Sequence, residues 1–326
     1  MRLRKQKKVV AVTLATAIAV STISASASAV QYDLANGDVT IDQDEHKGAY
    51  SYQGEDKENN RTYVNEDEKD DGKIIINGDK DTPTSNTVTV QEDVKKTNKD
   101  DGSEGRDVDI VIDGVKADTS ETGKSTVTVG EGADVDLTVK DSTLTTGGNG
   151  IDIGKDLDGT DENKDTKVDL TLEDTTINQT NKNSAGLDVR QGSDVDLTLK
   201  GDNTIDGSQA TGDKNVSDNT NVEGIRVGGE VASDSSDAEK DAHLTIKGDT
   251  SSKEEAAAEG SETSGDTTEN DKTSGGSLTI KDTTTGMVIA GGSKEKDSSV
   301  TITDGADVTI QDTHVSGSTQ SGSGVI

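Results

Sequence analysis

The sequence predicts an all-β protein, a right-handed parallel β-helix whose coils each contain about three short strands. Strands of alternating apolar and polar residues recur along the chain, and a second type of strand opens with glycine at a regular interval. Of the 326 residues, 27% are hydrophobic and 1% are aromatic. Such a composition alone indicates disorder, because few large side chains offset the loss of chain entropy. Stacked coils escape this limit, since small β-branched residues fill their core and every strand is hydrogen-bonded.

The first strand type alternates apolar and polar residues, as strands with one buried face do. Its clearest copies span 135–139, 168–172 and 195–199. Looser or earlier copies are 74–76, 88–90, 108–112, 127–129, 244–246, 278–280 and 308–310.

The second strand type begins with Gly150, Gly186, Gly224 and Gly286, at spacings of 36, 38 and 62 residues. Removing a 26-residue insertion at 250–275 turns 62 into 36, so the repeat is kept. A third short strand is expected around Leu144, Ile177, Ile205 and Val315. Three strands with glycine at a corner indicate a triangular β-helix. A β-sandwich array and disorder are the alternatives, although sandwiches do not usually return a residue at a fixed period.

Residues 1–29 indicate an export signal. A basic start precedes the apolar stretch 9–23, and small-residue sites predict cleavage after Ala27 or Ala29. The 15-residue apolar stretch is shorter than the ~20 residues that a spanning helix needs. We therefore expect a secreted or extracellular protein, free or attached to the cell surface, with no membrane insertion after cleavage.

We expect an N-terminal cap and irregular first coils in 30–105, and β-helix repeats in 106–326 with a disordered insertion at 250–275. The stretches 154–166, 207–221 and 231–241 are expected to be solvated loops. Segment 298–326 retraces 125–154 and ends inside a glycine-opened strand, which indicates truncation at the C-terminus.

The charge of the chain limits its partners. The formal net charge of −32 repels nucleic acid and anionic lipid and favours cations. The three histidines are far apart and there is no cysteine, so a zinc or nucleophile site is unsupported.

Stacking aligns equivalent side chains at about 4.8 Å. In the first strand type, Asp136, Asp169 and Asp196 form one outward row. Like charges at this spacing repel by roughly 1 kcal/mol in water, and calcium with oxygen ligands would relieve the repulsion. Solvent, salt and neighbouring lysines are the alternative.

A second row contains Asp152, Asp188 and Arg226. Adjacent coils would pair Asp188 with Arg226 in a surface ion pair. Alternatively, the two carboxylates and the arginine could hold calcium and abstract a proton from a uronate.

Two further features are candidate binding sites. Tyr50, Tyr52 and Tyr63 cluster in the sequence and predict either a small carbohydrate platform or packing of the cap. The sequence Asp156-Leu157-Asp158-Gly159 is similar to a calcium loop but lacks the EF-hand order of acids, glycine and terminal Glu.

The stretch 133–153, ADVDLTVKDSTLTTGGNGIDI, and the opening YDLANGDV at 32–39 resemble secreted clostridial β-helix proteins that carry a calcium- and polysaccharide-binding domain. Those proteins are akin to pectate lyases but lack the lyase machinery. The resemblance covers 108–326 and implies calcium in the acidic rows, with Asp152 and Asp188 at matching positions. Arg226 departs from that pattern.

The expected function is calcium-assisted, non-catalytic binding of polysaccharide or a host or cell-surface glycan, outside the cell. The alternatives are a structural, adhesin-like surface repeat protein and a pectate-lyase-like polysaccharide lyase. The identity of the ligand and the oligomeric state are left open.

Overall fold

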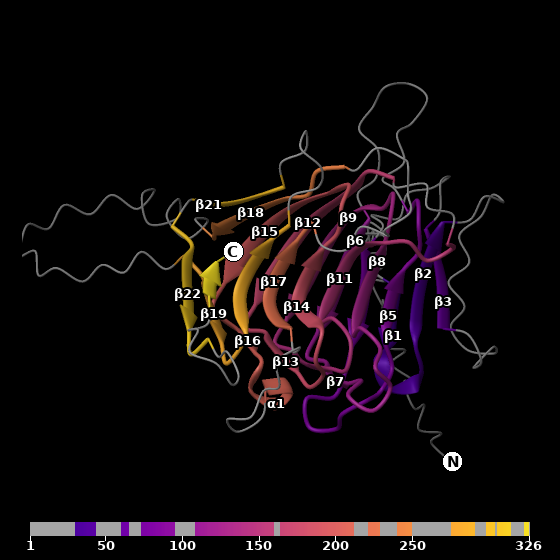
Figure 1. Ribbon diagram of the computed structural model, residues 1–326. Helices are drawn as coiled ribbons and strands as arrows, with labels where there is room; N and C mark the ends of the chain where they lie inside the picture. Colours follow the sequence, from indigo (N-terminus) through magenta and orange to yellow (C-terminus); the bar gives the residue numbers. More distant parts are fainter. Residues whose placement is uncertain are drawn as a thin grey trace, which may run out of the picture.

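The computed structural model describes residues 30–43, 60–64, 73–94, 108–159, 164–211, 221–228, 240–249, 275–290, 298–303, 305–313 and 323–325. They form three parallel sheets, named A, B and C, whose strands stack side by side along one axis (Figure 1). The chain runs through sheets A, C and B in turn within each complete coil, and then returns to sheet A. The parallel β-helix predicted from the sequence is confirmed.

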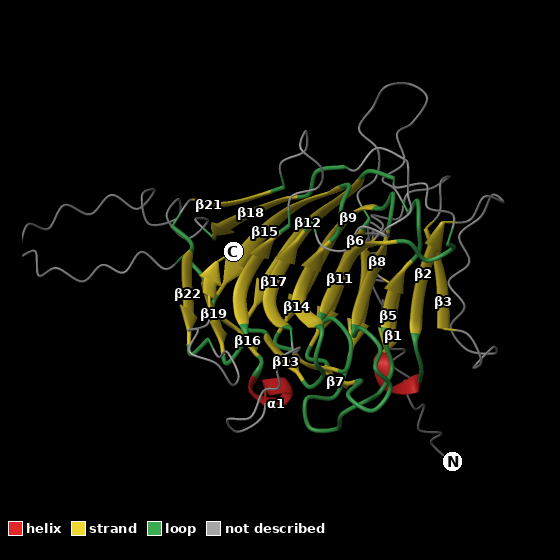
Figure 2. Cartoon of the chain, viewed as in Figure 1, coloured by secondary structure: helices red, strands yellow, loops and turns green. Residues whose placement is uncertain are grey.

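Each sheet follows its own side of the stack, and its strands neighbour one another in the spatial order below (Figure 2). Sheet A contains β1 (Val30–Asp33), β4 (Lys73–Asn77), β6 (Asp109–Asp113), β9 (Asp134–Lys140), β12 (Thr166–Glu173), β15 (Ser193–Lys200), β18 (His243–Gly248) and β21 (Ser299–Thr303). Sheet B contains β3 (Asn60–Val64), β2 (Val39–Gln43), β5 (Val88–Val90), β8 (Val127–Gly130), β11 (Ile151–Lys155), β14 (Ser184–Val189), β17 (Val222–Val227), β20 (Thr285–Ile289) and β23 (Ser323–Val325). Sheet C contains β7 (Lys116–Asp118), β10 (Thr143–Thr146), β13 (Thr176–Gln179), β16 (Asp202–Asp206), β19 (Ser277–Lys281) and β22 (Asp307–Gln311). A 3-10 helix, η1 (Leu34–Asn36), and a short α-helix, α1 (Ser208–Thr211), lie between strands.

The core is a column of small aliphatic side chains held in register from coil to coil. Leu137, Leu170 and Leu197 stack directly on one another in sheet A, and all three are fully buried. The burial of β9 alternates residue by residue, so one face points inward and the polar face points to solvent. Isoleucine, leucine and valine therefore fill most of the described interior, and Tyr32 is its one aromatic side chain among the described core residues.

Gly150, Gly186 and Gly224 lie in or directly before strands of sheet B, where neighbouring coils leave no room for a side chain. A Cβ on Gly150 would collide with the carbonyl oxygen of Gly186 in the next coil. The residues that follow these glycines and Gly286, namely Ile151, Leu187, Ile225 and Met287, pair in register. The predicted repeat of these positions is confirmed, but glycine does not open each strand. Gly186 and Gly224 are the third residues of β14 and β17, and Gly286 is the second residue of β20.

The copies of the first strand type do not all lie in one sheet. The copies at 88–90 and 127–129 lie in sheet B, and those at 278–280 and 308–310 lie in sheet C. Segment 298–326 consequently does not retrace 125–154, because 300–302 lies in sheet A whereas 127–129 lies in sheet B. An alternating Val-Thr-Val pattern buries one face equally well on any side of the coil, so it does not specify the sheet.

Several predictions concern residues outside the described ranges, namely the export signal at 1–29, Tyr50, Tyr52, Val315 and most of the insertion at 250–275. Within 30–105, β1, β2, β4 and β5 pair with the stack, and β3 adds a further strand beyond β2. Among the described residues, no helix has the length and apolar character needed to cross a membrane.

Candidate metal centre

Three neighbouring strands of sheet B are each followed by an acidic side chain. Glu92 comes two residues after β5, Glu131 directly after β8, and Asp156 directly after β11. The backbone N–H of Asp93 donates to the carbonyl of Glu131 at 3.1 Å, and the N–H of Glu131 donates to that of Lys155 at 3.0 Å. These bonds stack the three turns, so acids separated widely in sequence occupy successive coils at one corner.

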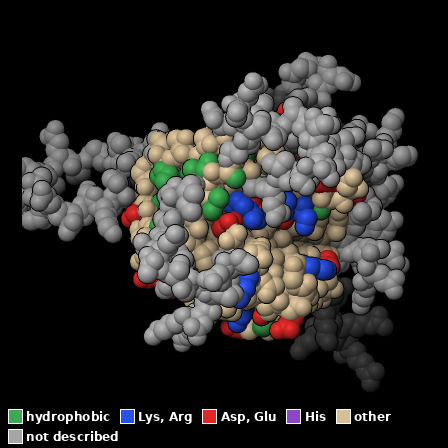
Figure 3. Space-filling view, in the orientation of Figure 1, with side chains coloured by type: hydrophobic (Ala, Val, Ile, Leu, Met, Phe, Trp, Pro, Cys, Tyr) green, Lys and Arg blue, Asp and Glu red, His purple; other side chains and the backbone are tan. Residues whose placement is uncertain are grey.

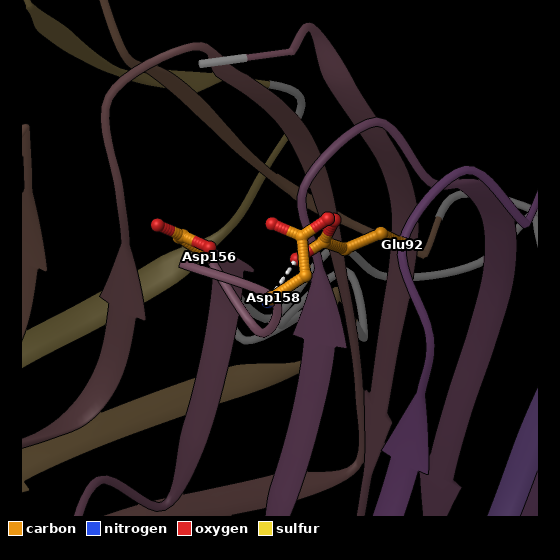
Figure 4. A group of neighbouring side chains, drawn as sticks. All are labelled: Glu92, Asp156 and Asp158. Atoms are coloured by element: carbon orange, nitrogen blue, oxygen red, sulfur yellow. Dashed lines mark hydrogen bonds between the residues drawn. The ribbon is translucent and has the colours of Figure 1, made fainter. Parts of the chain in front are cut away.

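The loop after β11 donates two backbone hydrogen bonds to the side chain of Glu92. The Oε1 atom of Glu92 accepts the backbone N–H of Leu157 at 2.5 Å and that of Asp158 at 2.9 Å. One carboxylate oxygen each from Glu92, Asp156 and Asp158 lie within 4.8 Å of one another (Figure 4). Figure 4 shows the carboxylates of Glu92 and Asp158 side by side, with Asp156 on the same loop as Asp158. This triad could hold a metal ion.

Glu131 lies beside the triad and is more deeply buried. The residue is 6% exposed, and its Oε1 atom accepts no hydrogen bond within the described part of the chain. Burial raises the pKa of the Glu131 carboxyl, and the negative charges of Glu92 and Asp156 raise it further. Lys164 opposes this rise with its charge and its backbone N–H. We call Glu92, Glu131, Asp156 and Asp158 the acidic corner.

The chemistry of the acidic corner favours a hard divalent cation. All four side chains offer carboxylate oxygens, the ligands that calcium and magnesium prefer. Calcium takes six to eight oxygens in flexible geometry, which suits a site assembled from three coils and a loop. A buried carboxylate oxygen without a hydrogen bond, such as Oε1 of Glu131, is costly, and a bound cation would offset that cost.

The predicted row of Asp136, Asp169 and Asp196 exists on the outer face of sheet A. The three residues pair in register, and Asp109 of β6 extends the row. A lysine forms a salt bridge with the aspartate at each end of the row. Lys73 lies 3.0 Å from Asp109, and Lys247 lies 3.7 Å from Asp196. Calcium binding by this row stays a prediction.

A parallel row on the same face alternates in charge. Asp113, Lys140, Glu173 and Lys200 follow one another from coil to coil. Lys140 lies 3.0 Å from Asp113, so the chain itself compensates this row.

The second predicted row forms a closed ionic network. Arg226 donates to both carboxylate oxygens of Asp188, at 2.9 and 2.7 Å. Arg190 donates to both oxygens of Asp152, at 2.6 and 3.1 Å. We call these four residues the arginine–aspartate network. Figure 3 shows basic and acidic side chains lying together on the visible face.

The predicted pairing of Asp188 with Arg226 is confirmed, but its location at the surface is wrong. Both aspartates are 1% exposed, and the side chain of Arg226 is 14% exposed. The guanidinium groups lie against the carboxylates, and Asn149 adds a hydrogen bond of 2.8 Å to Asp188. Asp152 and Asp188 therefore have cationic partners within the chain, which leaves less need for a metal ion there.

The structure does not assemble the three tyrosines into a site that can be described. Tyr50 and Tyr52 lie outside the described residues, and of Tyr63 only the backbone is placed, opposite Asp42 in the β2–β3 pair. Sequence reasoning missed Glu92 and Glu131. The available signal was an acid just after each of three apolar strands.

Comparisons with protein-family models, curated proteins and solved structures found no match to this chain. The resemblance to clostridial β-helix proteins accordingly stays a prediction. The function proposed for this chain therefore has its support in the sequence and the structure of the chain itself.

Proposed function

We propose that this chain is a non-catalytic binding protein of the extracellular space, in which a calcium ion at the acidic corner ties together the coils of β5, β8 and β11. The observation that carries the proposal is the buried Oε1 atom of Glu131, which lacks a hydrogen bond among the described residues, in a carboxyl that is close enough to Glu92 and Asp156 for their charges to raise its pKa. A carboxylate in that position is unfavourable without a cation. The export signal expected at 1–29 supports a calcium-rich setting outside the cell.

The arginine–aspartate network supports a non-catalytic role. In a lyase, an arginine acting as base would need a free guanidinium group facing the substrate. Here Arg190 and Arg226 each bind a buried carboxylate through two nitrogen atoms. Such paired, charge-assisted bonds hold the guanidinium groups in place.

The proposed ligand of the protein is a polysaccharide, bound on the outer face of sheet A. Next to the aspartate row, Thr138, Thr171 and Thr198 pair in register and form a row of hydroxyl groups. Adjacent rows of carboxylates and hydroxyls offer acceptors and donors repeated at about 4.8 Å, which suits a hydroxyl-rich polymer.

Calcium binding is tested by isothermal titration of the chelator-treated protein, followed by thermal unfolding with calcium or with EDTA. We expect about one ion per chain and stabilisation of about 2.7 kcal/mol at a calcium concentration one hundred times Kd. Glu92→Gln should abolish both effects. The matched control is Asp194→Asn, which removes an exposed acid of β15 outside the acidic corner and should leave both unchanged. Equal stability in calcium and in EDTA would refute the proposal.

Polysaccharide binding is tested by retention on insoluble cellulose and pectin. Replacing Thr138, Thr171 and Thr198 together with Val should reduce retention, because the hydroxyl row is lost while the strands are kept. The matched control replaces Thr143, Thr176 and Thr204, which form an equivalent row in sheet C. If the wild-type protein passes through both matrices, or if the sheet-C variant loses retention equally, the proposed binding face is wrong.

A further inference from the structure

Lys164 reaches across coils to the acidic corner. Its Nζ atom lies 2.7 Å from Oδ2 of Asp93 and 3.7 Å from Oε2 of Glu92. Its side chain is 24% exposed, so the ammonium group is partly withdrawn from water. Lys164 precedes β12, whereas Asp93 follows β5, so one side chain connects turns that are 71 residues apart in sequence.

The backbone makes room for this lysine at Gly132, in the coil between. A Cβ on Gly132 would approach Cδ and Cβ of Lys164 to 3.0 and 3.1 Å and Oδ1 of Asp93 to 2.6 Å. Gly132 also has a backbone φ of +73°, which residues other than glycine rarely adopt. The absence of a side chain at Gly132 therefore leaves room for the stem of Lys164 and the carboxylate of Asp93.

Glu92 is shared between the metal-binding triad and this lysine. Its Oε1 atom accepts the N–H groups of the Asp156–Asp158 loop, and its Oε2 atom faces the ammonium group. A divalent cation coordinated by the triad would repel a positive charge so close to Glu92. A metal ion at the triad and the ammonium group of Lys164 would therefore each weaken the other's interaction with Glu92.

We infer that Lys164 is an internal counter-ion of the acidic corner, which holds the corner in the absence of metal and which calcium must displace from Glu92. Lys164 thereby sets the calcium concentration at which the site fills. This inference rests on the proposed calcium site.

The experiment compares calcium titrations of wild-type protein, Lys164→Met and Lys164→Arg. Methionine keeps most of the apolar stem and removes the charge, so affinity should rise about 3- to 30-fold. Arginine keeps the charge, so affinity should stay within about 3-fold of wild type. In EDTA, Lys164→Met should unfold at a lower temperature than wild type, because the carboxylates lose their counter-ion.

The matched control is Lys155→Met, which removes the same charge from the end of β11, close to the same loop. Lys155 lies 3.7 Å from Asp152, in the arginine–aspartate network. We expect less than about 2-fold change in its calcium affinity. An equal rise in Lys155→Met and Lys164→Met would assign the effect to net charge and overturn the inference.

The failure of the inference can be separated from the failure of the proposed function. A wild-type protein that binds calcium with the same affinity as Lys164→Met overturns the role of Lys164 and leaves the calcium site intact. Loss of calcium binding in both proteins overturns the site. Binding by Lys164→Met alone would support the counter-ion and contradict calcium binding by the natural sequence.

Discussion

The acidic corner and the arginine–aspartate network lie on adjoining coils of sheet B, yet they handle buried carboxylates in opposite ways. Strand β11 contributes to both, with Asp152 inside the strand and Asp156 just after it. In the network, each buried aspartate binds an arginine through two nitrogens. In the corner, Glu131 keeps a buried oxygen without a hydrogen bond beside three further acids. Under the proposed function, an ion binds where the chain supplies too few cations, rather than wherever acids align.

The largest expected effect comes from breaking the network. Arg226→Met leaves the buried Asp188 without its main partner and should destabilise the protein by about 3–5 kcal/mol. Urea unfolding measures this change, and calcium should not restore the loss. The double variant Asp188→Asn with Arg226→Met should recover part of it, because no buried charge is left unpaired. A loss below about 1 kcal/mol in the single variant would contradict the account.

Glu131→Gln sharpens the comparison, because its effect should reverse with calcium. In EDTA the substitution removes an unfavourable buried charge and should raise stability by about 1 kcal/mol. In calcium the same variant lacks the negative charge near the metal-binding triad and should gain less from the ion than wild type does. Thermal unfolding in EDTA and in calcium measures the change in stability under each condition. Destabilisation in both would assign Glu131 a packing role.

The pH dependence of stability should differ in sign between Glu131 and Asp206. The folded-state pKa of Glu131 is raised, first by burial, so in EDTA its destabilising contribution should fade as pH drops through that pKa. Burial raises the pKa of Asp206, but the hydroxyl and N–H of Ser208 and the charge of Lys281 outweigh it, so the pKa is lowered. Its stabilising contribution is present above the unfolded-state pKa and should be lost as pH falls through the folded-state pKa.

Unfolding of wild type, Glu131→Gln and Asp206→Asn between neutral and acidic pH tests these signs. Relative to wild type, Glu131→Gln should be more stable and Asp206→Asn less stable near neutrality, each by up to about 1 kcal/mol. Both differences should shrink toward acidic pH. Differences that are independent of pH would mean that neither carboxyl titrates as described.

The smallest expected effect lies on the outer face of sheet A. Asp169 is exposed between Asp136 and Asp196, so Asp169→Asn should relieve repulsion and stabilise the fold by up to about 0.5 kcal/mol at low salt. The gain should vanish at high salt. Calcium affinity should not change, and a large loss of affinity would move the metal site to this row.

The sequence allowed the parallel stack to be predicted because strand period and glycine spacing are properties of the repeat. Assignment of strands to sheets failed at 88–90 and 127–129, since alternation identifies a buried face without identifying the side of the coil. The Asp156–Gly159 loop was recognised as similar to a calcium loop, but its partner Glu92 is 64 residues earlier and no local pattern joins them. The burial of Asp152 and Asp188 was missed because the strand pattern does not reveal that Arg190 pairs with Asp152 in the preceding coil.

Hydrogen–deuterium exchange of the wild-type protein, in calcium and in EDTA, is the direct test of whether an ion ties together the coils of the acidic corner. We expect calcium to slow exchange in 88–94, 127–132 and 151–159, where the backbone carries the acidic corner. We also expect little change in 184–189 and 222–227, where arginines already compensate the aspartates. Unchanged exchange at the corner, or slowing centred on the aspartate row of sheet A, would contradict this expectation.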